Sequence, residues 1–329
     1  MVESFDKQYQ PKADRPMAGA VSGKLEMKVI LLPKFYGHCP GLKRSLRIAD
    51  ELILESKKDC NPTSPRLRGA RKIYYDVPLA HNEEVEKRLK KGGFKEVNID
   101  EIKDGKSQYF LISAHGASPA KIALLESKNY VIKSAVCPTV EHVQKIAMAD
   151  HAAAYKIVIF GKKDHPEIKG VNGCVSDSSI VVSHADDGLM IKLDQKTSVI
   201  CQTTISSDKF AEFVQNLKKS NPKVEIITRN TICPIVEDRV RKCSAYVETE
   251  KPDLVVVVGS KTSSNTKQLA SKLSKIVPTL LVADEEEIKE EDFKNIKTVL
   301  VVSGTSAPPE IVERVAERLR TYERRKKAK

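Results

Sequence analysis

Short apolar runs alternate with longer amphipathic stretches along this chain. A run such as Leu254–Val258 has the length and composition of a buried strand, whereas residues 235–247 place apolar side chains at helical spacing. Strands that alternate with helices are typical of βαβ units, whose strands are parallel. The other strand-like runs lie at 27–32, 109–112, 130–136, 157–161, 198–201, 224–227 and 299–302. The pattern therefore predicts an α/β protein with small parallel sheets.

A Cys-Pro pair follows three of the strand-like runs. The pairs are Cys39-Pro40, Cys137-Pro138 and Cys233-Pro234, separated by 98 and 96 residues. A helical pattern follows each pair, at 42–54, 140–149 and 235–247. Proline suits the first position of a helix, and the helix N-terminus favours a thiolate on the residue before it. Each cysteine is therefore predicted to lie where a strand hands over to a helix.

Two further polar turns recur in each repeat. The first set lies at 81–84, 165–167 and 263–266, and the second at 113–119, 202–206 and 303–308. Ligand-binding residues of parallel sheets lie at the carboxyl ends of the strands, which is where these turns fall. We therefore expect three similar α/β domains of about 95 residues whose strand ends face one shared centre.

The repeat sets the expected domain boundaries. Domain 1 spans residues 28–136, domain 2 spans 137–232 and domain 3 spans 233–317. Residues 1–27 are an N-terminal extension and 318–329 a basic C-terminal tail, which carries seven of the basic residues and one acid.

Composition narrows the class of protein. The 329 residues have a net charge of +12, with no tryptophan and 5% aromatic residues, which argues against a platform for stacking single-stranded nucleic acid. We expect no membrane partner, because no apolar run approaches about 18 residues. Residues 1–27 lack the apolar segment of a secretory signal, so the expected location is cytoplasmic. A plastid-type organelle is the alternative if that extension is the remnant of a transit peptide.

Seven cysteines without a C-x-x-C pair, and without a secretory signal, predict reduced thiols. If the three domains face one shared centre, Cys39, Cys137 and Cys233 come together there. Three thiolates at one point would hold a metal centre. A structural zinc site usually has four protein ligands, so three leave a vacancy, and an iron-sulfur cluster held by three cysteines has one iron without a protein ligand. The alternative for any single cysteine is a small buried hydrophobe, which is our interpretation of Cys201 and Cys243.

The polar turns indicate an anionic ligand. Donors at strand ends beside helix starts fit phosphate or diphosphate, although a helix N-cap is the alternative for residues 263–265. The absence of Walker and G-x-G-x-x-G motifs argues against nucleotides. Glu167 is the acid nearest the expected centre and is a candidate proton donor. The candidate ligand-binding residues are His81, His115, His165, Thr203, Ser263, Ser264, Asn265 and Ser306.

The ordered set of motifs resembles the 4-hydroxy-3-methylbut-2-enyl diphosphate reductase family (IspH/LytB). The resemblance covers about residues 28–318. The matching stretches are 37–41, 81–82, 113–116, 137–138, 161–167, 202–204, 259–265 and 303–308. Each stretch is weak alone, but their order is specific.

The resemblance implies a trefoil of three α/β domains around an oxygen-sensitive [4Fe-4S] cluster with one open iron. It implies reductive dehydroxylation of the allylic diphosphate to isopentenyl and dimethylallyl diphosphates, the last step of the non-mevalonate isoprenoid pathway. Carried over, the three Cys-Pro cysteines are cluster ligands. Glu167 and Thr203 contact the substrate hydroxyl, with Glu167 as the proton source, and His165 is assigned to both catalysis and substrate binding. The diphosphate-binding set is His81, His115, His165, Ser263, Ser264, Asn265 and Ser306.

The expected partners follow from the same resemblance. No flavin or nicotinamide motif is visible, so electrons must come from an external donor such as ferredoxin or flavodoxin, and a basic surface would suit an acidic one. The chain is expected to be a monomer or a homodimer.

Two alternatives stay open. One is a related cluster-dependent reductase or dehydratase acting on another hydroxylated substrate. Unchanged turnover of the allylic diphosphate by a Glu167→Ala variant would favour it. The other is a zinc-bound or metal-free scaffold whose basic tail docks on nucleic acid or an acidic protein in a salt-dependent way.

Overall fold

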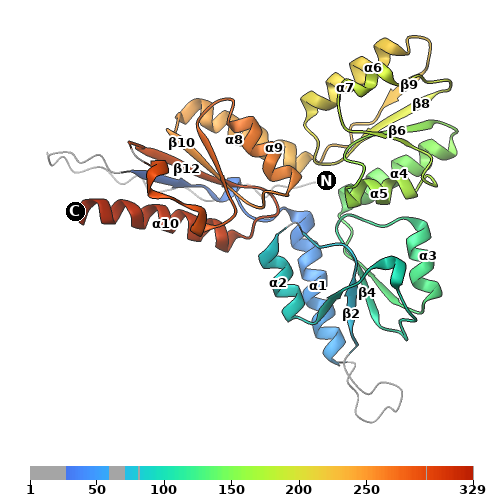
Figure 1. Cartoon of the computed structure of the whole chain (residues 1–329), viewed down its shortest axis with the longest axis horizontal. Coiled ribbons are helices and arrows are strands. Elements are labelled where there is room, and N and C mark those ends of the chain that lie inside the picture. Colours follow the sequence, from blue (N-terminus) through green and yellow to red (C-terminus); the bar gives the residue numbers. More distant parts are fainter. Residues whose placement is uncertain (1–26, 59–70, 81, 294, 329) are drawn as a thin grey trace, which may run out of the picture.

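Three lobes, each built on a four-stranded parallel sheet, make up the computed structural model of this chain (Figure 1). The structure describes residues 27–58, 71–80, 82–293 and 295–328, and the side chains as far as residue 321. The lobes surround one centre, as the sequence pattern predicts, and the α/β trefoil class is thereby confirmed.

The first lobe has the strand order β3-β2-β4-β5 and the second has β7-β6-β8-β9. The elements of the first lobe are α1 (Pro40–Lys58), β2 (Ile73–Tyr75), α2 (Glu83–Lys91), β3 (Phe94–Glu96), a 3-10 turn η2 (Ile99–Glu101), β4 (Tyr109–Ile112), α3 (Pro119–Ser127) and β5 (Val131–Ser134). Those of the second are α4 (Pro138–Ala152), β6 (Lys156–Phe160), α5 (Pro166–Gly173), β7 (Ile180–Val182), α6 (Asp187–Met190), β8 (Thr197–Cys201), α7 (Ser207–Ser220) and β9 (Ile226–Thr228).

The third lobe has the order β11-β10-β12-β1. Its elements are β1 (Lys28–Leu31), a 3-10 turn η1 (Pro33–Phe35), α8 (Pro234–Glu250), β10 (Leu254–Val258), α9 (Ser264–Leu273), β11 (Thr279–Val282), 3-10 turns η3 (Glu285–Glu287) and η4 (Glu290–Phe293), β12 (Thr298–Ser303) and α10 (Pro309–Ala328). No helix in the described ranges is both long and apolar enough to cross a membrane.

The first strand belongs to the third lobe rather than to the first, where the predicted boundary at residue 28 put it. It pairs with β12 in a parallel register that runs from Lys28 opposite Thr298 to Leu31 opposite Val301. The reason is topological: the strand before each Cys-Pro pair is the edge strand of the preceding lobe, as β5 is before Cys137 and β9 before Cys233. With β1 as its last strand, the third sheet has the same order as the other two.

The predicted basic tail also differs from the structure. Helix α10 continues through residue 318 to Ala328, and Leu319 is fully buried in the core of the third lobe. The segment is therefore the end of a packed helix, at least to Leu319, and not a separate tail that begins at residue 318.

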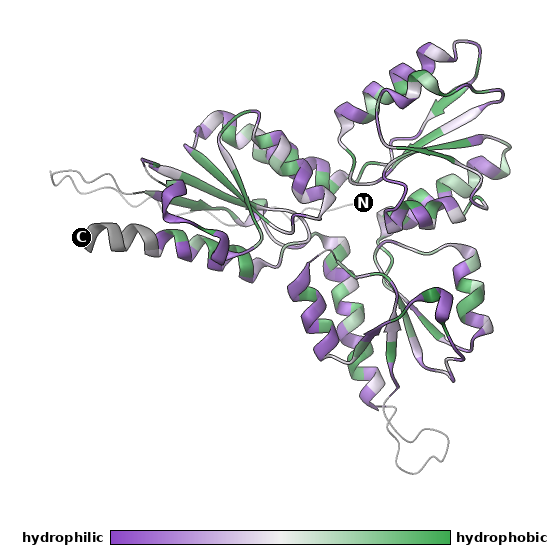
Figure 2. Cartoon of the chain, in the orientation of Figure 1, coloured by the Kyte–Doolittle hydropathy of each residue, from purple (hydrophilic) through white to green (hydrophobic). Residues whose placement is uncertain are grey.

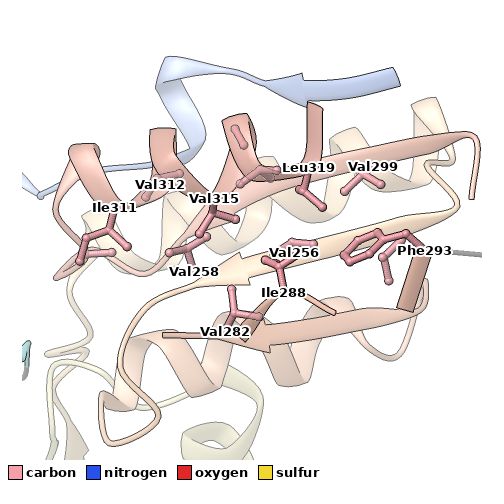
Figure 3. Close-up of a cluster of buried hydrophobic side chains, with 14 of the residues drawn as sticks. Val256, Val258, Val282, Ile288, Phe293, Val299, Ile311, Val312, Val315 and Leu319 are labelled. Carbon is pink, nitrogen blue, oxygen red and sulfur yellow. The ribbon is translucent and has the colours of Figure 1, made fainter. Parts of the chain in front are cut away.

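The sheet of the third lobe is buried on both faces, which explains its continuous apolar strands. On one face, Val256 and Val258 of β10 pack with Val312 and Val315 of α10 (Figure 3). On the other face, Val255 and Val257 pack with α8 and α9, and Cys243 lies in this second cluster with no exposed surface, as its interpretation as a packing residue requires. Strands β4, β6 and β10, one in each lobe, are correspondingly hydrophobic, whereas the edge strand β3 is mostly hydrophilic (Figure 2).

Polar contacts connect each lobe to the other two. Between the first and second, the Gln144 side chain donates to the carbonyl of Ala117 over 3.1 Å. Between the second and third, Lys272 pairs with Asp208 at 2.8 Å. Between the third and first, Arg314 pairs with Glu84 at 3.3 Å. These contacts link the three lobes around the common centre.

Candidate active site at the three-lobe centre

The three Cys-Pro cysteines occupy equivalent positions, one at the start of a helix in each lobe. Each cysteine carbonyl accepts the first helical hydrogen bond, from Lys43, Glu141 and Glu237 respectively. Each cysteine N–H donates to a carbonyl of the polar turn in the preceding lobe: Cys39 to Thr305 (3.1 Å), Cys137 to Ala114 (3.1 Å) and Cys233 to Thr203 (2.7 Å). The repeated hydrogen bond ties every cysteine to a candidate ligand-binding turn.

The thiols converge on one region. Burial raises the pKa of the Cys39 thiol, and the neighbouring thiols of Cys137 and Cys233 raise it further. The N–H of Leu42 donates to Cys39 Sγ over 3.4 Å and opposes that rise. A Cβ added at Gly41 would lie 2.8 Å from Cys137 Sγ and 3.9 Å from Cys39 Sγ. Glycine at this position therefore leaves room for two sulfurs beside the start of α1.

Glu167 lies in a nearly water-free position beside Thr203. It is the second residue of α5, whose N-cap is His165, and only 2% of its surface is exposed. The Thr203 N–H donates to Oε1 over 2.7 Å, and the Thr203 hydroxyl donates to Oε2 over 2.8 Å. Burial raises the pKa of this carboxyl to about 7, even though both hydrogen bonds from Thr203 lower it. At neutral pH the carboxyl is thus close to half protonated and able to give or take a proton.

Two histidines from different lobes meet next to this carboxyl. The rings of His115 and His165 are in edge-to-face contact with centroids 5.5 Å apart. Nδ1 of His115 lies 3.3 Å from the Ser113 hydroxyl, and Nδ1 of His165 accepts the Glu167 N–H at 3.3 Å. The structure therefore brings these two predicted site residues together, whereas the predicted His81 lies outside the described residues.

A buried pair of hydroxyls marks the third lobe. The Ser263 and Ser306 hydroxyls are 3.3 Å apart, and 1% and 8% of these residues are exposed. Ser263 is the N-cap of α9, but its side chain makes no capping hydrogen bond. Asn265 Oδ1 accepts the N–H of Thr305 over 2.8 Å, which ties α9 to the turn that holds Cys39. Ser264, the first residue of α9, is half-buried beside them.

The arrangement of these hydroxyls is suited to an anion. The first N–H groups of α9 have no intrahelical partner, and the positive end of the helix dipole favours negative charge there. The Ser263 hydroxyl contacts Ser306 and does not cap these N–H groups, so the N-cap alternative explains the position of Ser263 but not the orientation of its side chain. Gly304 lets the turn at 303–308 approach the turn at 263–266 closely, since a Cβ added at Gly304 would lie 2.8 Å from Asn265 Oδ1.

Sequence reasoning missed one functional candidate, Arg239. Its guanidinium donates to the carbonyls of Gly37 (2.8 Å), Ser303 (3.3 Å) and Gly304 (3.4 Å), next to the turn that holds Cys39. The available signal was the family resemblance, because this arginine, six residues after Cys233, is the part of the family's pattern behind the third cysteine that the chain keeps.

Three parallel sheets that each direct a cysteine helix and a polar turn to one centre define a three-lobed α/β protein with a three-cysteine site. The family model described as LytB protein matches residues 30–320, so this chain belongs to the LytB family. The resemblance expected from the sequence motifs is thereby confirmed.

Known relatives and structures agree with that membership. The chain is 32% identical over 286 residues to the 4-hydroxy-3-methylbut-2-enyl diphosphate reductase of Dictyoglomus thermophilum, covering 87% of this chain and 94% of the relative. It is 32% identical over 295 residues to the reductase of the same name from Thermotoga maritima, covering 89% and 97%. The solved E-1-hydroxy-2-methyl-but-2-enyl-4-diphosphate reductase of Plasmodium falciparum superposes with a TM-score of 0.75 and 25% identity, covering 89% of this chain and 87% of that one. A solved (E)-4-hydroxy-3-methyl-but-2-enyl diphosphate reductase, described as the terminal enzyme of the non-mevalonate pathway, superposes with a TM-score of 0.62 and 27% identity, covering 90% and 99%.

Proposed function

We propose that this chain is a 4-hydroxy-3-methylbut-2-enyl diphosphate reductase. It would remove the allylic hydroxyl as water with two electrons and two protons, giving isopentenyl and dimethylallyl diphosphates in the last step of the non-mevalonate pathway. The identity of the substrate is taken from the names of the relatives. The observation that carries the proposal for this chain is the link through Thr203, which binds the Glu167 carboxyl on one side and the Cys233 N–H on the other.

The residues present fit an iron-sulfur cluster. The three thiols lie at three helix N-termini, which stabilise thiolates, and Cys137 and Cys233 are close enough to act electrostatically on Cys39. A structural zinc site usually has four protein ligands, whereas this centre offers three cysteines, which suits a cluster with one open iron. Cys39, Cys137 and Cys233 would hold a [4Fe-4S] cluster with one open iron, which supplies electrons and Lewis acidity when bound.

The proton would come from Glu167. In its protonated form the carboxyl donates through Oε2 to Thr203 Oγ1, and the Thr203 hydroxyl then donates its own hydrogen to the substrate oxygen. A donor with a pKa of about 7 is well matched to protonating a leaving hydroxyl at neutral pH. Because the carboxyl is buried, bulk water does not compete for this proton.

The diphosphate would bind across the lobes. Ser263, Ser264, Asn265 and Ser306 lie at the positive end of α9, where backbone N–H groups and hydroxyls can donate to phosphate oxygens. His115 and His165 would add donors from the first and second lobes. Fixing the charged tail in this way positions the reacting carbon without large apolar contacts.

The electrons would come from an external protein. A net charge of +12 suits an acidic donor such as a ferredoxin or flavodoxin. An electron-transfer rate that does not change with salt would contradict this part of the proposal.

Anaerobic purification with iron and sulfide analysis, followed by an assay of the allylic diphosphate with a chemical reductant, tests the function. We expect close to four irons per chain, both products, and loss of iron when any of the three cysteines is replaced by serine. A protein that stays free of iron after anaerobic reconstitution, or that holds zinc, would indicate the scaffold instead. Iron without turnover of this substrate would indicate a related reductase or dehydratase.

A further inference from the structure

Arg239 connects the helix that carries Cys233 to the loop that carries Cys39. It lies on α8, and one nitrogen of its guanidinium, Nη1, faces three carbonyl oxygens. The shortest contact, 2.8 Å, is with Gly37, two residues before Cys39. The other two carbonyls, Ser303 and Gly304, precede the residue to which the Cys39 N–H donates. The Arg239 side chain therefore connects α8, which begins after Cys233, with the segments on both sides of the Cys39 backbone contact. It can thereby set the spacing between Cys39 and Cys233.

The loop before Cys39 depends on such support. Gly37 has a φ of +81°, a conformation that glycine adopts readily and other residues rarely do. Its N–H donates to the Ser303 hydroxyl over 2.9 Å, and that hydroxyl in turn donates to the Gly304 carbonyl over 2.9 Å. Arg239 binds the carbonyl side of the same loop, so removal of its side chain would leave the Gly37 and Gly304 carbonyls without their common donor.

The positive charge of Arg239 is not paired with a carboxylate of any described residue. Throughout the described ranges, no acidic side chain forms an ion pair with it, although its neighbour Arg241 pairs with Asp238. Burial lowers the pKa of the Arg239 guanidinium, yet arginine stays protonated at neutral pH. The two groups whose negative charge would favour the guanidinium are Cys243 and Cys39. Cys39 is one of the proposed cluster ligands, so the guanidinium lies within electrostatic reach of the three-cysteine centre.

We propose that Arg239 is a positioning residue with two effects on the three-cysteine centre, an inference that rests on the proposed function. Its guanidinium holds the Cys39 loop and the Cys233 helix at the spacing the cluster requires. Its unbalanced charge stabilises the more negative, reduced form of the cluster and so raises the reduction potential. A residue that only clipped the loop would produce the first effect without the second.

Two substitutions separate spacing from charge. Arg239→Met removes both the donors and the charge, whereas Arg239→Lys keeps the charge but replaces the planar, multi-donor group with a point donor. Arg241→Met on the same helix is the matched control, because Arg241 is exposed and paired with Asp238. Circular dichroism of each purified protein establishes that the variants fold.

Three measurements test the proposal. We expect faster amide exchange in the 36–42 segment of the metal-free Arg239→Met protein, and faster release of iron to a chelator from both Arg239 variants. A potentiometric titration followed by EPR should give a more negative midpoint for Arg239→Met and a value close to wild type for Arg239→Lys. Arg241→Met should match the wild type throughout.

Unchanged exchange and iron release in Arg239→Met would overturn the positioning role, and an unchanged midpoint in that variant would overturn the effect of charge. If Arg239→Met cannot retain the cluster, a wild-type rate of iron release from Arg239→Lys would likewise overturn positioning. These results differ from failure of the proposed function, in which the wild-type chain itself would bind no iron after reconstitution.

Discussion

Glu167 and Thr203 are joined by two hydrogen bonds, one from the threonine N–H to Oε1 (2.7 Å) and one from its hydroxyl to Oε2 (2.8 Å). The carbonyl of the same threonine accepts the N–H of Cys233 at 2.7 Å. A buried acid and the backbone of a cysteine at the site centre are thus held by a single residue that lies just after β8.

The first prediction concerns the proton donor. Glu167→Gln keeps an oxygen that accepts from the Thr203 N–H but removes the acidic proton. We expect iron content to stay at the wild-type level and turnover of the allylic diphosphate to fall by roughly 100-fold or more. If the variant still turns over the allylic diphosphate at the wild-type rate, Glu167 is not its proton donor. That result would favour the alternative of a related reductase or dehydratase acting on another hydroxylated substrate.

The second prediction concerns stability and pH. Burial raises the pKa of Glu167 from 4.5 to about 7, so between these values the folded state binds more protons than the unfolded chain. The contribution of this residue to stability is complete below pH 4.5 and is lost as the pH rises toward 7, by up to about 3 kcal/mol. Denaturant unfolding of the metal-free protein should show Glu167→Gln gaining stability relative to wild type across this window. A constant difference between the two proteins from pH 4.5 to 8 would contradict the shift.

The third prediction concerns the hydroxyl of Thr203. Thr203→Val removes a hydrogen bond that lowers the pKa of Glu167, so that pKa should rise further, and the relay of the proton is lost. Thr203→Ser keeps the hydroxyl and is the matched control. We expect the alkaline limb of the pH profile of kcat/KM to move upward in the valine variant alone, with a lower maximum. Identical profiles for valine and serine would show that the hydroxyl has no role.

The fourth prediction concerns Gly41, whose backbone has an ordinary helical φ. In Gly41→Ala the new methyl group would lie 2.8 Å from Cys137 Sγ and would displace it. Alanine is also the better helix former, by up to about 1 kcal/mol. The metal-free variant should therefore unfold at the same or a higher denaturant concentration than wild type while binding less iron after reconstitution. Wild-type iron content would show that Cys137 can move without cost.

The fifth prediction concerns the hydroxyl pair of the third lobe. Ser263→Ala and Ser306→Ala each remove a donor from the anion site, so KM for the diphosphate substrate should rise by about 10-fold in each, with a smaller change in kcat. Ser274→Ala, at the exposed opposite end of α9, serves as the control. An unchanged KM in both site variants would place the diphosphate elsewhere.

The sequence was sufficient to locate the residues that sit at strand ends, because a strand, a turn and a helix leave a local pattern. Cys39, Cys137 and Cys233 follow from that pattern, as do the turns that contain Glu167, Thr203 and Ser263. The environment of these residues was not predictable: the burial that shifts the pKa of Glu167 comes from packing between distant elements.

Two features required the three-dimensional structure for a different reason. The pairing of β1 with β12 joins opposite ends of the sequence, and no local pattern distinguishes the edge strand of one lobe from the first strand of the next. The role of Arg239 depends on three carbonyl groups, which every residue possesses and which therefore leave no trace in the sequence.

The position of β1 also dictates an order of events during synthesis. Of the described strands, β1 is made first and its partner β12 is made last. The first two lobes contain all of their own strands and can fold while translation continues, whereas the third must wait for β12. Cys39 follows β1 directly and binds Thr305 of the late segment, so it is the last of the three thiols to reach its final place. The three thiols can therefore reach their common centre only after Thr305 has been synthesised.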